Sequence, residues 1–300
     1  MNPHLAPSPK VRLSKIGLGT ATFGREIDQL EAFGMMDHAR TKGINHIDTA
    51  FHYSKGECER IIGAWLASRR PEPGSLMVAT KMWFPYTPAL VQASVEQSLQ
   101  RLGVEAIDYF YFHKWDEGAA DPSVLAALDR LVREGKLRAL GASNFTADQL
   151  ERVLRLQAEL GYARLQVLQN NNNFAVRHID EPLRQLCATE NIDLITFSPL
   201  GAGFLTGKHR QGVEPGSRFA LVKNSPKIYF TDLAWSRLDR LEAVAAKYGH
   251  SPIVLAMAWA LHQPGITSVL AGGRKSAHID QAFAGLELDQ AEIWRELEKE

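Results

Sequence analysis

Three apolar runs that each lead to polar residues decide the fold: Asn45-His46-Ile47-Asp48-Thr49-Ala50-Phe51-His52-Tyr53, Val78-Ala79-Thr80-Lys81 and Tyr109-Phe110-Tyr111-Phe112-His113. If these runs are strands of one parallel barrel, their polar side chains meet at its C-terminal face, where barrel enzymes build active sites. A phenol beside an ammonium, a carboxylate and an imidazole can donate a proton to a reacting group. The sequence therefore predicts a catalytic set of Asp48, Tyr53, Lys81 and His113. We expect Asp48 to anchor Lys81, and Lys81 to lower the pKa of Tyr53.

Each of these residues also has an ordinary interpretation when it is taken alone. An aspartate after a strand often caps a loop, a single lysine is often solvated, and a single histidine is often a structural group. The joint pattern favours catalysis, because three successive strands end in complementary chemistry.

Strand and helix signals alternate along the rest of the chain. The predicted strands are 16–19, 44–48, 76–81, 107–113, 137–143, 165–169, 192–198 and 266–270. The predicted helices are 28–42, 57–69, 88–102, 122–134, 146–160, 181–190, 233–248, 252–262, 277–284 and 290–300. Short apolar strands separated by helices are typical of a parallel sheet that is buried on both faces.

Eight strand–helix units in this length predict one (β/α)8 TIM-barrel domain over residues 1–300, with its active site at the C-terminal face. The alternative is a doubly wound sheet, which usually carries a Gly-x-Gly-x-x-Gly turn after its first strand. The segment Gly17-Leu18-Gly19-Thr20-Ala21-Thr22-Phe23-Gly24 lacks that spacing. The barrel is therefore the preferred prediction.

Composition excludes several classes of function. Lys+Arg and Asp+Glu number 34 each, so no charge surplus points to nucleic acid or to a membrane surface. No stretch of about 18 apolar residues is present, and residues 1–10 lack the apolar core of a secretory signal. Cys58 and Cys187 form no metal-ligand spacing, so we predict no metal site. A reducing cytoplasm is the predicted location.

A long segment between residues 198 and 231 has little periodicity. It begins Phe197-Ser198-Pro199-Leu200-Gly201-Ala202-Gly203-Phe204-Leu205-Thr206-Gly207-Lys208 and continues to Arg218. Glycine-freed backbone NH groups together with Lys208 and Arg218 would suit a pyrophosphate. The alternative is an irregular surface excursion without a function.

At this point the chain resembles the aldo-keto reductases over nearly its whole length. The matching segments are Gly17-Leu18-Gly19-Thr20, Asp48-Thr49-Ala50 with Tyr53, Ala79-Thr80-Lys81, Ile107-Asp108-Tyr109 leading to His113, Leu131-Val132-Arg133-Glu134-Gly135-Lys136, Gly141-Ala142-Ser143-Asn144-Phe145, and the segment from Ser198 to Lys208. It is most similar to the branch with a Ser-Pro-Leu cofactor loop. That branch includes potassium-channel β-subunits and many microbial reductases.

The resemblance implies a nicotinamide cofactor that lies extended across the barrel mouth. Amide and hydroxyl groups after the fifth and sixth strands would hold the carboxamide, and Phe197 would lie against the nicotinamide ring. The loop after Phe197 would clasp the pyrophosphate and ribose as a belt, and the start of the last barrel helix would meet the adenosine end. The implied cofactor residues are Gly19, Thr20, Asp48, Ser143, Asn144, Gln169, Phe197, Ser198, Pro199, Leu200, Gly201, Ala202, Lys208, Arg218, Gly273, Arg274, His278 and Gln281.

The chain departs from the family pattern at three places. Phe197 stands where many relatives have tyrosine or tryptophan, which keeps an aromatic face and loses a polar group. The Gln-x-Glu-Tyr sequence of many relatives is replaced by Gln169-Asn170-Asn171-Asn172-Asn173, and their adenine-contacting Glu-Asn pair by Gln281 and Ala282. None of these changes touches the four central residues.

The leading hypothesis is reversible hydride transfer between NADP(H) and a carbonyl or alcohol. NADP(H) is expected to be preferred over NAD(H), because Arg274 offers a planar fork for a 2′-phosphate. Two alternatives remain open: a Schiff-base aldolase that uses Lys81, and a non-catalytic, cofactor-binding regulatory subunit.

The predicted partner is a small carbonyl compound, with a sugar or sugar-derived aldehyde as the first hypothesis. Aromatic residues that follow the first four strands could wall the mouth, and the asparagine run could bind hydroxyl groups, although core packing and turn formation are the alternatives. The predicted substrate-binding residues are Phe23, Phe51, Trp83, Trp115 and Asn172. The sequence leaves open whether the chain forms a homo-oligomer.

Overall fold

Eight parallel strands close into a barrel in the computed structural model, which describes residues 12–222 and 226–299. Each strand pairs with the next in the sequence, and the last pairs with the first. The strands are β1 (Ile16–Gly19), β2 (His46–Asp48), β3 (Met77–Met82), β4 (Ile107–Phe112), β5 (Leu137–Ser143), β6 (Leu165–Asn171), β7 (Asp193–Phe197) and β8 (Ser268–Ala271). The predicted (β/α)8 barrel is confirmed.

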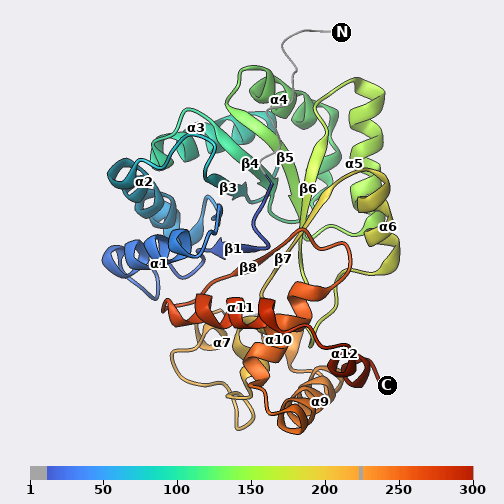
Figure 1. The fold of residues 1–300 in the computed structure, drawn as a ribbon. Helices are drawn as coiled ribbons and strands as arrows, with labels where there is room; N and C mark the ends of the chain where they lie inside the picture. Colours follow the sequence, from blue (N-terminus) through green and yellow to red (C-terminus); the bar gives the residue numbers. More distant parts are fainter. Residues whose placement is uncertain (1–11, 223–225, 300) are drawn as a thin grey trace.

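Helices surround the strands, with α1–α3 on one side and α5 and α6 on the other (Figure 1). The helices are α1 (Gln29–Thr41), α2 (Glu57–Arg69), α3 (Pro88–Leu102), α4 (Pro122–Arg133), α5 (Ala147–Leu160), α6 (Glu181–Thr189), α7 (Arg218–Leu221), α8 (Pro226–Tyr229), α9 (Asp232–Tyr248), α10 (Pro252–His262), α11 (Ala277–Glu287) and α12 (Ala291–Leu297). Three short 3-10 turns are η1 (Tyr53–Gly56), η2 (Glu117–Ala120) and η3 (Gly201–Thr206).

Local sequence sets several helix ends as predicted. The side chain of Thr146 accepts a hydrogen bond from the Gln149 backbone, and the Gln149 side chain bonds back to the Thr146 backbone, so α5 begins with the predicted capping box. At the end of α3, Gly103 takes the left-handed φ of 64° that glycine adopts without steric cost. These signals fix the helix lengths and therefore where each strand ends.

Two apolar layers make up the core. One lies between the strands and the helices, and the other fills the barrel interior. The interior layer consists of Leu13, Met77, Ala79, Tyr109, Tyr111, Ala139, Val167, Ile195 and Leu270. At Gly141 on β5 a Cβ atom would lie 2.5 Å from the Tyr111 ring, so the interior is closely filled. Chemistry is therefore confined to the rim of the barrel.

The segment after β7 is more regular than its sequence indicates. It contains η3, α7 and α8, none of which the periodicity predicts. Its apolar anchors are widely spaced: Phe204, Phe219 and Tyr229 are each buried, and the rings of Phe204 and Phe219 both contact that of Tyr229. Tertiary packing, rather than an amphipathic pattern, orders this segment.

Several strand bounds also differ by one or two residues, among them that of β6, which was expected to end at Gln169. It continues through Asn170 and Asn171, because these residues pair in register with Thr196 and Phe197 of β7.

No helix within residues 12–222 and 226–299 is both long and apolar enough to cross a lipid bilayer.

The contact between α2 and α3 yields a stability prediction. A Cβ atom at Gly63 of α2 would lie 2.3 Å from the carbonyl oxygen of Arg101 on α3, so Gly63→Ala must push the helices apart. We expect a loss of ~1–3 kcal/mol in the free energy of unfolding, measured by urea titration. Gly34→Ala is the control, because Gly34 is also inside a helix and no atom lies within 4 Å of its Cβ position. That variant should gain about 1 kcal/mol. Equal midpoints for both variants would contradict the close α2–α3 contact.

Candidate active site

A buried ion pair lies where β2 and β3 end at the C-terminal face. The ammonium Nζ of Lys81 donates to Asp48 Oδ1 at 2.5 Å and to the Thr49 carbonyl at 2.8 Å. Gln169 Nε2 donates to the second oxygen of Asp48 at 2.8 Å. Only 1% of Lys81 and 3% of Asp48 are exposed. The predicted anchoring of Lys81 by Asp48 is present, and both carboxylate oxygens are satisfied.

Tyr53 lies beside this pair, in the turn η1 that follows β2. Its ring centre is 5.8 Å from Lys81 Nζ. Burial raises the pKa of Tyr53 above its ordinary value, while the positive charges of Lys81 and Arg218 lower it and the negative charge of Asp48 raises it. Lys81 lowers the pKa of Tyr53 as predicted, but burial has the larger effect and the net pKa is raised. Lys81 therefore moderates the effect of burial, and Tyr53 carries its proton at neutral pH.

His113 follows β4 and closes the set. Its ring centre lies 5.9 Å from that of Tyr53, and its ring stacks on His52 at 5.4 Å and meets Trp83 at 4.8 Å. Burial and, secondarily, the charge of Lys81 hold the pKa of His113 well below its ordinary value. The imidazole is therefore neutral at pH 7. A neutral imidazole has one N–H to donate, which suits a hydrogen bond to a carbonyl oxygen.

Three of the four, Asp48, Tyr53 and His113, line one end of a cleft of about 600 Å³ that runs across the barrel mouth toward the start of α11, whereas Lys81 is buried and reaches the site through Asp48. All but one of the predicted cofactor residues line it. They are Gly19, Thr20, Asp48, Ser143, Asn144, Gln169, Phe197, Ser198, Pro199, Leu200, Ala202, Lys208, Arg218, Gly273, Arg274, His278 and Gln281. The structure thus brings the residues implied by the family resemblance to one cleft, and their roles toward a cofactor stay predictions.

The far end of the cleft is positively charged. The pKa of His278 is lowered, first by burial and then by the nearby charges of Arg274, Lys275 and Lys208. The backbone N–H of Arg274 donates to His278 Nδ1 at 3.1 Å, and its guanidinium reaches the carbonyl of Gly216 at 3.5 Å. Because the chain as a whole has zero formal charge, this cluster is a local feature that suits phosphate groups.

Two predicted aromatic wall residues and one glycine lie elsewhere. Phe23 is fully buried in the core, so the prediction that it walls the mouth is wrong. Trp115 packs edge-on against Phe145 at 5.1 Å and lies under the guanidinium of Arg152, away from the cleft. Gly201 does not line the cleft either. Its Cβ would lie 2.9 Å from the Tyr229 ring, so close packing explains this glycine.

Phe51 is also absent from the cleft lining. Its ring lies 4.4 Å from the Arg101 guanidinium carbon, on the side of α3. Of the four aromatic residues predicted to bind substrate, Trp83 is the one that lines the cleft, with 41% of its surface exposed.

The asparagine run serves the fold. Asn172 is 3% exposed and does not line the cleft, which contradicts its predicted contact with substrate hydroxyls. Asn170 donates to the Phe145 carbonyl at 2.8 Å, and Asn171 bonds to the Tyr229 hydroxyl at 3.0 Å. These two side chains lie in β6 and tie it to distant segments. The turn-forming alternative applies to Asn173, whose Oδ1 accepts from the backbone N–H groups of Ala175 and Val176.

Three kinds of lining residue were missed. His52 stands inside the first quoted segment, and only its stacking on His113 shows that it faces the cleft. Ile253 and Met257 come from α10, whose uniformly apolar sequence predicts core alone. Arg25 and Glu26 form an ion pair at 2.6 Å along the rim, and nothing in their sequence distinguishes them from solvated charges.

Within the described part of the chain, no cluster of three or more His, Cys, Asp or Glu side chains is arranged to hold a metal ion.

Comparisons with known proteins agree with this geometry. The profile of the Aldo/keto reductase family matches residues 15–298. The Protein tas of Escherichia coli is 28% identical over 97% of this chain and 95% of its own length. Norsolorinic acid reductase B of Dothistroma septosporum is 29% identical over 97% of this chain and 79% of its own. A probable voltage-gated potassium channel subunit beta of Oryza sativa is 28% identical over 93% of this chain and 89% of its own.

The buried ion pair generates a stability prediction. Asp48→Asn leaves the Lys81 ammonium buried without a counter-charge, so we expect a loss of ~3–5 kcal/mol in the free energy of unfolding at pH 7. Asp48→Asn combined with Lys81→Met removes both charges and should lose less than the two single variants added together. Urea unfolding monitored by circular dichroism measures all three. Strict additivity would show that the two side chains do not act as a pair.

Proposed function

The chain belongs to the aldo/keto reductase family, and from this premise we propose that it catalyses NADP(H)-dependent hydride transfer between the nicotinamide and a carbonyl or alcohol substrate. One observation carries the proposal. The buried Lys81–Asp48 pair lies beside a neutral phenol and a neutral imidazole at one end of a cleft, and the other end is lined by cations.

The residues along the cleft fit a dinucleotide. Hydroxyl and amide groups of Ser143, Asn144 and Gln169 lie at the end of the cleft near the catalytic set, where a carboxamide needs donors and acceptors. Lys208 and Arg274 lie at the far end, where phosphates need positive charge. We propose that these residues bind the cofactor, which when bound supplies the hydride.

The chain's own residues supply the proton and the electrostatic field. Tyr53 delivers its hydroxyl proton to the oxygen of the reacting carbonyl, because it is a neutral phenol that lines the cleft beside the ammonium, whereas Tyr111, also close to Lys81, does not line the cleft. His113 donates its N–H to the same oxygen and orients the carbonyl. Lys81 stabilises the phenolate that remains, and Asp48 keeps Lys81 in place.

The two alternative functions fit the site less well. A Schiff-base aldolase needs a neutral lysine, whereas the Lys81 amine donates to Asp48 and to the Thr49 carbonyl as a protonated group does. A regulatory subunit without activity would not need the complete catalytic set that this chain keeps. One relative is named as a potassium channel subunit and another as a norsolorinic acid reductase, so the comparisons do not argue against catalysis.

We propose a carbonyl compound as the substrate. The structure removes one of the two arguments for a sugar. Asn172 is buried, so the carboxamides that favoured hydroxyl binding do not reach the cleft. The exposed face of Trp83, with His52 beside it at 5.2 Å, still offers a flat surface on which a sugar or an aromatic aldehyde could stack. We propose both as the substrates to test first.

Removing the phenolic proton tests the reaction. Tyr53→Phe keeps the ring and loses only the transferable proton, so turnover should fall by about 10²–10⁴-fold. The NADPH dissociation constant, measured by fluorescence quenching, should stay within about two-fold of wild type. The assay follows NADPH absorbance with aromatic aldehydes, aliphatic aldehydes and monosaccharides. Retention of more than about a tenth of the wild-type rate would remove Tyr53 from the acid role.

Arg274 tests the cofactor preference. Its planar guanidinium stands beside Lys275 at the start of α11, where a 2′-phosphate would gain charge-assisted hydrogen bonds. Arg274→Ala should weaken NADP(H) binding by at least about ten-fold and leave NAD(H) binding nearly unchanged, since one such contact is worth roughly 1.5–3 kcal/mol. Isothermal titration with both cofactors measures this. Equal affinities for NADP(H) and NAD(H), unaffected by the substitution, would contradict the preference.

A further inference from the structure

The turn that carries Tyr53 has a strained backbone. Ser54 and Lys55, the two residues after Tyr53, have φ angles of 50° and 57°, a left-handed conformation that non-glycine residues rarely adopt. Such a conformation persists only where the surrounding structure determines it. The turn therefore depends on contacts from other elements to keep Tyr53 in place.

Arg101, in the last turn of α3, supplies contacts on both sides of Tyr53. Its Nη1 donates to the Phe51 carbonyl at 3.0 Å, and its guanidinium carbon lies 4.4 Å from the centre of the Phe51 ring. On the other side, a Cβ atom at Gly56 would lie 2.6 Å from the guanidinium, so that glycine packs directly on it. Arg101 thus holds the residue two positions before Tyr53 and the residue three positions after it.

Arg101 is itself fixed by a buried carboxylate. Its Nη1 lies 3.1 Å from Glu59 Oε2, and Glu59 is 0% exposed. The other oxygen, Glu59 Oε1, accepts a hydrogen bond from the Thr80 hydroxyl at 2.7 Å. Thr80 directly precedes Lys81 on β3. A continuous chain of hydrogen bonds thus connects the strand of Lys81 to the turn of Tyr53.

A second contact joins the same two elements. The backbone N–H of Phe51 donates to the Lys81 carbonyl at 2.9 Å. Phe51 is therefore bound through its N–H by β3 and through its carbonyl and ring by Arg101. This explains why Phe51, which was expected to contact substrate, faces α3 instead.

We propose that Arg101 is a positioning residue that holds Tyr53 against Lys81 through Phe51, Gly56 and the buried Glu59. The proposal rests on the proposed function, in which Tyr53 is the proton donor. Arg101 itself touches neither substrate nor cofactor, because it does not line the cleft.

The consequence is specific. Without Arg101 the turn loses its contacts on both sides, and the phenol moves relative to the ammonium. Because the charge of Lys81 lowers the pKa of Tyr53, a greater separation raises that pKa further and weakens Tyr53 as an acid. Residues at the cation end of the cleft, such as Arg274, keep their surroundings, so cofactor binding should be spared.

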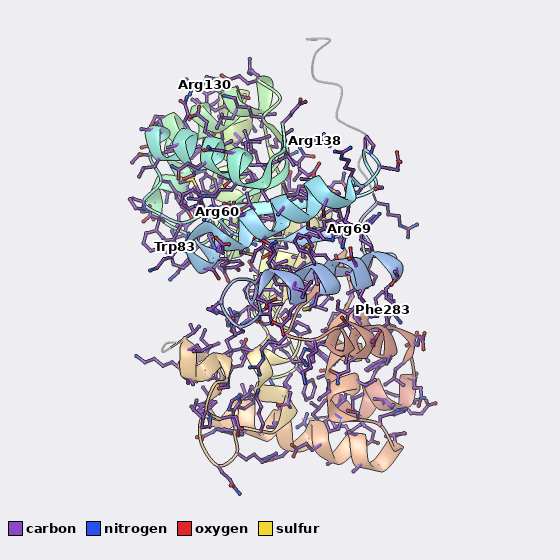
Figure 2. All side chains as sticks on the ribbon, turned by 90° about the vertical axis from the view of Figure 1, so that its left-hand side faces the viewer. Arg60, Arg69, Trp83, Arg130, Arg138 and Phe283 are labelled. Atoms are coloured by element: carbon purple, nitrogen blue, oxygen red, sulfur yellow. The ribbon has the colours of Figure 1, made fainter. Side chains whose placement is uncertain are left out.

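The kinetic test compares Arg101→Met with Arg69→Met. Arg69 on α2 is a matched control, because it also pairs with a carboxylate, Asp37 at 2.8 Å, and also covers a ring, that of Phe33 at 5.7 Å. Figure 2 shows Arg69 toward the end of α2 that lies away from Trp83. We expect kcat to fall by about 10–100-fold in Arg101→Met and by less than about two-fold in Arg69→Met. The NADPH dissociation constant should be unchanged in both.

A second measurement follows the titration of the Tyr53 phenol directly. Uniform incorporation of 3,5-difluorotyrosine brings phenol titrations toward neutral pH, and 19F NMR follows each one, with Tyr53→Phe assigning the resonance of interest. The Tyr53 titration should move to higher pH in Arg101→Met and stay in place in Arg69→Met. This measurement needs no turnover, so it decides the role of Arg101 even if the wild-type chain reduces no carbonyl compound.

Two further variants complete the test. Arg101→Met leaves Glu59 buried without its partner, so Arg101→Met combined with Glu59→Gln is the variant to use if the single one fails to fold. Arg101→Lys restores a charge without the planar fork and should recover only part of kcat. An unmoved Tyr53 titration in the folded Arg101 variants, with kcat equal to that of Arg69→Met, would overturn the proposal.

Discussion

Two charges taken out of water must satisfy each other, and in this barrel they do so where β2 and β3 end. Lys81 and Asp48 are nearly fully buried, and each has further hydrogen-bond partners in Thr49 and Gln169. Such a pair contributes little net stability, but losing one member is costly, so the geometry around it is narrowly fixed. The protonation states of the neighbouring groups respond to this pair. Its charge moderates the pKa of Tyr53 and helps to keep His113 neutral.

The fold and the centre of the site could be predicted because both follow from local sequence. A parallel barrel requires short apolar strands and places the residues that end them at one face, so Asp48, Lys81 and His113 had to come together once the strands were recognised. Glycine and threonine signals at helix ends fixed the lengths between them. The cofactor residues came from the family resemblance, and the structure places nearly all of them along one cleft.

What could not be predicted depends on the direction of side chains after a strand has ended. Phe23, Phe51 and Trp115 each follow a strand, but in a loop the alternation of faces no longer holds, and distant partners decide where each ring packs. Asn172 is polar and still buried. The net direction of the Tyr53 pKa shift could not be predicted for a similar reason. The sequence shows the lysine that lowers the pKa, whereas the larger effect of burial exists only in the folded chain.

The arrangement separates positioning from chemistry. The barrel interior is closely filled with apolar side chains and the belt segment (residues 198–222) is anchored by Phe204 and Phe219, so neither can absorb movement of the catalytic groups. The turn of Tyr53 is the strained part of the site, and strain of this kind persists where surrounding contacts over-determine it. The buried Glu59 and the α2–α3 contact at Gly63 supply those constraints from outside the cleft. Loops at the mouth can therefore vary with substrate while the proton donor stays where the ion pair needs it.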